Sequence, residues 1–275
     1  MNKKLLLTIG SCSVLAATLA QAQVITAWNF DNLTTATNLS PVASTGVGTA
    51  TALGMGIYPT PAAGLNTPDV LVGKTTDTGA NLIADTSNIW RIRATGGGNG
   101  WSTNAPIGTQ GAKFAASTVG FTGINVSFDW YVTTQGEANM QLLYTTDGIN
   151  FNNVALTLGA GSGISVLNNS SSPNTVLGSY VHASGQDWFT GLNATITDPA
   201  AANNPLFAVE MVNASQLGDN VAAAGTLLNN TSGNWRFDNV TISGTTVPEP
   251  SATALLGLGF GLLGYAARRR QNKSA

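Results

Sequence analysis

The chain contains very little cysteine, histidine or charge. Its 275 residues include one cysteine, Cys12, and one histidine, His182, and only 9% of the residues are charged. Cys12 lies in a segment that is predicted below to be removed, so the mature chain has no cysteine. Disulfides, a cysteine nucleophile and thiolate metal ligands are therefore excluded. A single histidine cannot build a zinc site, because such sites use several histidine or cysteine ligands.

Positive charge is scarce between the two ends of the chain. Residues 23–246 carry five basic side chains against twelve acidic ones, which leaves a net charge of −7. The value for the whole chain is only −2, because most of the basic residues lie in the terminal segments. An acidic and charge-poor surface repels a phosphate backbone, so nucleic acid is excluded as a partner.

The residues of common hydrolase sites are also few. The span 23–246 has two glutamates, Glu137 and Glu210, far apart in the sequence and without the acid-pair pattern that glycosidases use. No Gly-x-Ser-x-Gly elbow accompanies His182, so the sequence does not indicate a serine-hydrolase triad. We therefore predict no catalytic residues and no enzymatic activity, and an extracellular hydrolase is the weakest alternative.

The first 22 residues predict an export signal. Lys3 and Lys4 supply a positive start, and residues 5–19 supply an apolar core. Ala20-Gln21-Ala22 follows the small-x-small rule for signal cleavage. Cleavage between Ala22 and Gln23 would make Gln23 the mature N-terminus.

The C-terminal segment, residues 247–275, has three parts in a fixed order. They are Pro248-Glu249-Pro250, an apolar run at 252–267, and a basic cluster at 268–273 that contains Arg268, Arg269 and Arg270. The prolines favour an extended, accessible strip, which suits entry into a peptidase groove. At ~1.5 Å per residue the apolar run spans about 24 Å, and snorkelling arginines with local bilayer thinning can cover the remainder of a ~30 Å core. Because basic clusters prefer the cytoplasmic side, we predict a single transmembrane helix with its C-terminus inside.

This order of parts resembles the PEP-CTERM sorting tails of many exported bacterial proteins. The matching residues are Val247 to Ser251 (VPEPS), the Gly/Leu-rich segment from Ala254 to Gly264, and the arginine cluster. The resemblance implies recognition by an exosortase, a membrane-embedded cysteine peptidase or transpeptidase that would cut near Pro-Glu-Pro. It also implies a transient stay of the tail in the inner membrane. The alternative is a plain C-terminal anchor with a stiff proline linker.

The span between these segments predicts an all-β fold. Short strands alternate with Gly, Asn and Pro turns, and no long segment has a helical apolar period. The clearest strand is residues 125–133 (NVSFDWYVT), with Val126, Phe128, Trp130 and Val132 on the face predicted to enter the core. In the segment 235–242 the alternation shifts phase near Asp238-Asn239, which predicts a β-bulge. These features favour one β-sandwich of ordinary size.

A second resemblance concerns the same span. FDWYV, LLYTTDGINF, FAVEMV and WRFDNVTISG, between Ile89 and Gly244, are similar to segments of jelly-roll domains common in PEP-CTERM proteins. Such domains resemble carbohydrate-binding modules and concanavalin-like or laminin-G-like sandwiches. The resemblance implies a jelly-roll β-sandwich and does not identify a ligand.

Binding of extracellular polysaccharide would require exposed aromatic faces beside polar side chains. The candidate contacts are Trp101, Asp129, Tyr131 and Trp188. Tyr131 follows Asp129 on the polar face of its strand, and the two tryptophans lie in glycine-containing loops. In the alternative interpretation the tryptophans cap the ends of the sandwich.

No metal-ligand set and no cofactor is predicted, although structural calcium stays open as an alternative. Asp31, Asp129, Asp147 and Asp238 are candidates only by analogy with other extracellular sandwiches. The sequence has no D-x-D-x-D-G loop, so such a site would have to be assembled from distant strands.

Together these segments predict a signal peptide at 1–22, an exported β-sandwich at 23–246 and a sorting tail at 247–275. We expect the protein in the cell envelope, on the outer surface or in the extracellular matrix, with the tail initially in the inner membrane. The leading functional interpretation is a structural or matrix-associated, non-catalytic protein. The alternative is a carbohydrate-binding, lectin-like module.

Overall fold

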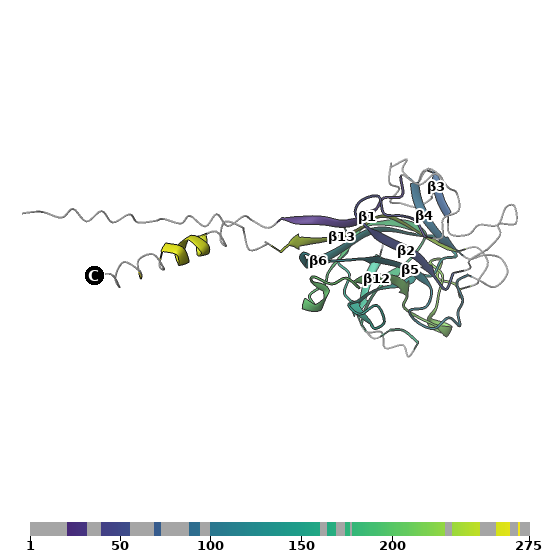
Figure 1. Cartoon of the computed structure of the whole chain (residues 1–275). Coiled ribbons are helices and arrows are strands. Elements are labelled where there is room, and N and C mark those ends of the chain that lie inside the picture. The colour runs from purple at the N-terminus through teal and green to yellow at the C-terminus, as the bar shows by residue number, and fades with distance from the viewer. Residues whose placement is uncertain are drawn as a thin grey trace, which may run out of the picture. The chain divides into compact units, whose positions relative to one another are not determined.

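Two antiparallel β-sheets make up the body of the chain in this computed structural model (Figure 1). The structure describes residues 21–31, 40–55, 69–72, 88–93, 100–159, 164–168, 174–176, 178–228, 233–247, 257–264 and 269. Residues 22–247 form one compact unit.

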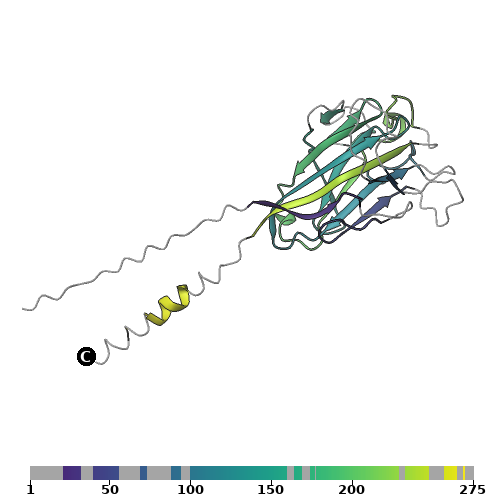
Figure 2. The same cartoon turned by 90° about the horizontal axis from the view of Figure 1, so that it is seen from above.

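The first sheet is organised around its longest strand, β13 (Asn234–Thr246), which crosses the body in Figure 2. The strand order is β11 (Asp187–Thr195), β6 (Phe121–Val132), β13, β4 (Asn88–Arg93) and β3 (Asp69–Val72). The N-terminal strand β1 (Ala22–Trp28) pairs with the C-terminal half of β13, and β4 pairs with the N-terminal half along the same edge. The strand that ends the body is therefore held by three partners.

The second sheet has seven strands. Their order is β2 (Gly48–Leu53), β5 (Gly111–Ala116), β12 (Ala208–Asn213), β7 (Asn139–Thr145), β10 (Ser179–Ala183) and β9 (Ile164–Asn168), with β8 (Phe151–Val154) also paired to β7. Two short 3-10 turns, at Pro199–Ala201 and Leu217–Asp219, lie in the connections. The predicted all-β sandwich is confirmed.

The core between the sheets is rich in aromatic rings. Phe114 on β5 lies 5.1 Å from the ring of Trp28 and 5.8 Å from that of Trp90, so side chains of the two sheets interdigitate. The residues predicted to face inward from β6 are all buried there: Val126, Phe128, Trp130 and Val132. Burying an aromatic side chain of this size contributes roughly 1.5–3 kcal/mol. The alternation read from the sequence therefore identified the correct inner face.

The predicted bulge in β13 is also confirmed. The register between β13 and β6 shifts between Asp238 and Thr241, and Asn239 has a positive φ of 50°. Asparagine tolerates this left-handed conformation better than most residues do. The bulge explains why the alternation changes phase from Phe237 to Val240, since one extra residue turns the following side chains to the other face.

Asparagine side chains bind the loops in place of disulfides. Asn213 is fully buried, and its Oδ1 accepts the backbone N–H groups of Thr109 (3.0 Å) and Gln110 (2.9 Å). Its Nδ2 donates to the carbonyls of Pro106 (3.1 Å) and Ser215 (3.2 Å). One amide thus uses its two donors and accepts twice, and it joins the segment before β5 to the segment after β12.

Candidate functional site

The aromatic residues predicted to contact sugar are not on the surface. Trp101 and Trp188 are 0% exposed and Tyr131 is 1% exposed, so the expectation that they offer open faces is wrong. Trp101 packs against Trp235 in the main core, with ring centroids 4.4 Å apart. Since all six tryptophans of the chain are fully buried, none offers a flat surface for stacking on a pyranose ring.

Tyr131 lies on the predicted face of β6, opposite to the face that carries Trp130, but this face is covered by a second cluster of buried hydrophobic side chains. Tyr131 packs against Trp188 at 5.3 Å and is joined there by Ile89. The guanidinium of Arg236 lies 4.7 Å from the Tyr131 ring centroid, within cation–π range. Strand alternation distinguishes the two faces of a sheet, but it does not show that side chains of neighbouring strands cover the outer one.

Asp129 is half-buried and has a structural position. Its Oδ1 accepts the backbone N–H of Gly191 (2.8 Å), and its Oδ2 accepts from Nδ2 of Asn239 (2.9 Å). Gly191 and Asn239 lie at the register shifts of β11 and β13, the two strands that flank β6. One carboxylate therefore holds the bulges of both neighbouring strands, and each of its oxygens already accepts a hydrogen bond.

The other aspartates considered for calcium are similarly engaged. Asp31 Oδ1 accepts the N–H of Asn88 at 3.0 Å. Asp238 Oδ1 accepts the N–H of Asn239 at 2.7 Å, and Asp238 is only 1% exposed, so it is buried in the sheet. Within the described ranges, no three His, Cys, Asp or Glu side chains gather in a way that could hold a metal ion.

Asp147 organises the turn between β7 and β8, and Asp147-Gly148 is a residue pair that predicts a tight hairpin turn because it tolerates a positive φ. Its carboxylate accepts from the side chain of Asn150 (2.6 Å), the backbone N–H groups of Asn150 (2.7 Å) and Ile149 (2.8 Å), and the hydroxyl of Thr145 (3.0 Å). These bonds, led by the Asn150 side chain, lower the pKa of Asp147 well below its usual range. Gly148 has a φ of 77°, which closes the turn.

The most unusual polar group in the body is Glu137, which has no exposed surface. Its Oε1 accepts the backbone N–H of Asn139 at 2.8 Å, while its Oε2 is buried without a hydrogen-bond partner among the described residues. The indole N–H of Trp235 donates to the backbone carbonyl of Glu137 at 2.7 Å. Desolvation raises the pKa of Glu137 well above its usual range, and this effect exceeds the opposing effect of Asn139 and Ser215, which lower the pKa. The group is suited to remain neutral and to fix the β6–β7 connection.

The single histidine extends this network. Asn139 Nδ2 donates to Ser215 Oγ (2.8 Å) and to the Asp219 carbonyl (3.1 Å), so its Oδ1 is the acceptor that faces His182 Nδ1 at 2.7 Å. His182 Nδ1 therefore carries a proton in this arrangement. Partial burial lowers the pKa of His182, which favours its neutral form. This arrangement orients the ring within a strand of the second sheet.

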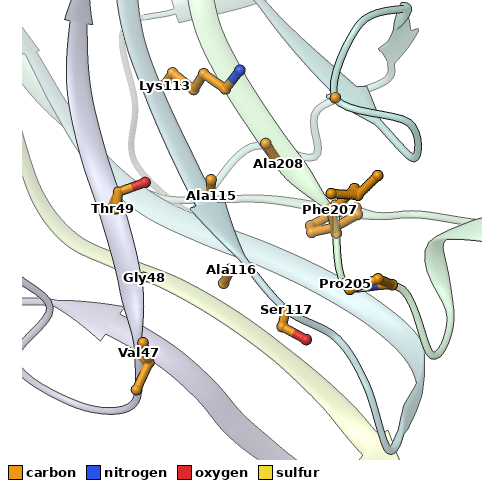
Figure 3. A pocket seen from close by; sticks show the side chains of 12 residues that line it. Val47, Gly48, Thr49, Lys113, Ala115, Ala116, Ser117, Pro205, Phe207 and Ala208 are labelled. Atoms are coloured by element: carbon orange, nitrogen blue, oxygen red, sulfur yellow. The ribbon is translucent and has the colours of Figure 1, made fainter.

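A shallow groove of about 370 Å³ lies where β2 and β12 begin and β5 ends (Figure 3). Its lining is mostly small: Gly48, Thr49, Ala115, Ala116, Ser117 and Ala208, with Val47, Lys113, Gly148, Pro205, Leu206 and Phe207 around them. Val47 and Thr49 lie on one side, and Pro205 and Phe207 lie on the other. Exposed Val47 and Leu206 make the rim apolar.

Lys113 supplies the charge at one end of the groove (Figure 3). Its ammonium lies 3.9 Å from Glu210 and 5.0 Å from the ring centroid of Phe151. Partial burial raises the pKa of Glu210, and Lys113 opposes that shift. The groove was not anticipated from the sequence, because its lining comes from segments far apart in the chain and its small residues carry no motif.

The two ends of the body meet on neighbouring strands. β1 and β13 are antiparallel, with Ala22 opposite Thr245 and Gln23 opposite Gly244, and their free ends lie together in both views (Figures 1 and 2). On the other side of β13, Thr245 lies opposite Thr122 on β6. The Val247 N–H donates to the Gly120 carbonyl at 2.9 Å, and Val247 is the final residue of this unit. The predicted signal-cleavage bond thus falls inside the first strand, directly beside the end of the last strand.

Of the predicted tail, the structure describes residues 257–264, which are helical, and residue 269. Leu258, Phe260, Leu262 and Leu263 in this segment are 65–67% exposed. Across the described parts of the chain, no helix is long and apolar enough to cross a membrane. Pro248-Glu249-Pro250, Arg268 and Arg270, like the signal sequence before Gln21, lie outside the described residues.

A family model described as the PEP-CTERM protein-sorting motif matches residues 246–270. No curated protein matches the chain. The matched span begins at the last residue of β13, so the sorting motif and the sheet share Thr246.

Proposed function

The chain is an exported protein with a PEP-CTERM sorting motif, and we propose that its β-sandwich serves as a structural, non-catalytic part of the cell envelope or extracellular matrix. The observation that carries the proposal is the motif at residues 246–270, which implies processing by an exosortase. In this proposal the signal at 1–22 starts export, and the segment 252–267 holds the chain in the inner membrane as a single helix. Exosortase action then frees the body.

Features of the body support a structural role outside the cell. Its loops are tied by buried amides such as Asn213, and Asp129 holds two bulges, so the fold is braced without disulfides. The strand order, in which β13 lies between β6 and β4 while β12 lies between β5 and β7, suits the jelly-roll interpretation. A rigid, acidic module of this kind can fill or coat a matrix without acting on a substrate.

The test is to follow the mature protein in its native host. We expect the exported form to have lost the segment after Pro248-Glu249-Pro250, as shown by sequencing its C-terminal peptide. A variant with alanine at Pro248, Glu249 and Pro250 should accumulate in the inner-membrane fraction, whereas Gln271→Ala should behave as wild type. Recovery of an intact Arg270 end on exported protein would refute the processing.

Polysaccharide binding is retained as a second candidate because of the groove beside Lys113. The groove offers hydroxyls from Thr49 and Ser117 and an apolar rim, a combination that suits a sugar polymer. We expect saturable co-sedimentation of the body with the host's extracellular polysaccharide. Loss of this binding in EDTA would indicate that it depends on calcium. Ala115→Arg, which fills the groove, should abolish binding, while Thr51→Arg on exposed β2 surface outside the groove should not.

A further inference from the structure

The sorting motif follows the folded body without any linker. β13 ends at Thr246, Val247 is hydrogen-bonded to Gly120, and Pro248 is the next residue. One extended residue covers at most ~3.6 Å, so the first proline is attached within that distance of a residue bound to the sheet. The residues on the N-terminal side of the motif therefore belong to the β-sandwich.

This end of β13 is paired on both sides. Thr245 lies opposite Thr122 of β6 and opposite Ala22 of β1, and Gly244 lies opposite Gln23. Gly244 is buried, Thr245 and Thr246 are half-buried, and Val247 is exposed. Pairing on both edges reaches Thr245, whereas Thr246 pairs only with Phe121 of β6 and Val247 is held through its N–H alone.

Enzymes and domains that capture an extended peptide do so through those same backbone groups. A peptidase that cuts near Pro-Glu-Pro needs the few residues before the motif as well as the motif itself. Thr245 and Thr246 are not available in that form while they are paired in the sheet, and Val247 is held beside them by its bond to Gly120. The predicted signal cleavage after Ala22 would remove the residue opposite Thr245.

We propose that the exosortase acts on this chain only when Thr245 and Thr246 have left the sheet and Val247 has released Gly120, so that the folded body slows removal of its own sorting tail. The inference rests on the proposed processing by an exosortase. Opening a strand end breaks only a few hydrogen bonds, so the folded body should slow cleavage by about tenfold rather than block it. Removal of the signal peptide would take away Ala22, the residue of β1 that lies opposite Thr245, and should precede efficient tail removal.

The test uses the full chain in its native host and measures the rate of tail loss after pulse labelling. A Gly-Ser-Gly-Ser insertion between Val247 and Pro248 places the motif beyond the sheet and should raise the rate by about tenfold. The same insertion after Lys273 is the matched control and should leave the rate unchanged.

A clamp tests the opposite direction. Residues directly opposite on antiparallel strands lie ~4.5–5.5 Å apart at Cα, within the range that a disulfide spans. The double variant Thr122→Cys, Thr245→Cys should form a disulfide, since the mature chain has no other cysteine, and should lose its tail more slowly. Reductant should restore the rate, and the single variants should resemble wild type.

Equal rates for wild type, spacer and clamp would overturn the proposal while leaving exosortase processing intact. A wild-type chain that keeps its tail in the host would overturn both, so the two failures are distinguishable. A faster spacer variant together with a slower, reductant-sensitive clamp would establish the sheet end as the element that controls tail removal.

Discussion

Asn213→Ala tests whether buried amides replace disulfides in this body. The substitution removes four hydrogen bonds and leaves the buried N–H of Gln110 without its acceptor, while the N–H of Thr109 keeps only its longer bond to the Pro106 carbonyl (3.3 Å). A lost bond costs about 0.5–1.5 kcal/mol net, and a buried group left unsatisfied costs about 1–3 kcal/mol. Allowing for water entry at the partly exposed carbonyls, we expect a loss of about 3 kcal/mol in the free energy of unfolding.

The assay is urea unfolding of residues 23–247 followed by tryptophan fluorescence, which reports on the six buried indoles. For a body of this size, about 3 kcal/mol corresponds to a fall of roughly 6–12 °C in Tm. Asn152→Ala is the matched control, because Asn152 is exposed on β8 and should change stability by less than about 0.5 kcal/mol. Equal effects of the two substitutions would refute the reasoning that loop closure depends on the buried amide.

Three further predictions follow from the same contacts. The pKa of Glu137 is raised in the folded state, so the free energy of unfolding of the wild type should fall as pH rises from the ordinary carboxyl pKa toward the folded value. Glu137→Gln removes this titration and should flatten the decline. Parallel stability–pH curves for the two proteins would contradict this. Trp101→Ala should lower the unfolding free energy by about 3–5 kcal/mol, as for other buried tryptophans, and an unchanged Tm would show that Trp101 is not core. Asp129→Ala should lower the free energy of unfolding by about 1–2 kcal/mol, and Asp129→Asn should lower it less, since asparagine keeps one acceptor for the two bulges. Hydrogen exchange of the Gly191 amide measures the loss at one bulge, and unaltered exchange in both variants would count against the bulge assignment.

Much of the fold could be predicted from the sequence. The alternation of β6 identified its inner face, the phase shift near Asp238 predicted the bulge of β13, and Asp147-Gly148 predicted a turn. Each of these signals is local, because strand periodicity and turn chemistry depend on residues only a few positions apart. The burial of Glu137 could not be predicted, since no short sequence pattern marks a carboxyl group as buried.

The sorting motif was determined by the sequence alone, because Pro-Glu-Pro, an apolar run and an arginine cluster are read in linear order. The tertiary structure decided what the surface offers. It buried Trp101, Tyr131 and Trp188, since side chains from neighbouring strands cover positions that alternation assigns to an outer or loop surface. It also placed Ala22, at the predicted signal-cleavage site, opposite Thr245, although the two residues are separated by nearly the whole body. Such pairing depends on which strands become neighbours, and that outcome follows from the packing of the entire core.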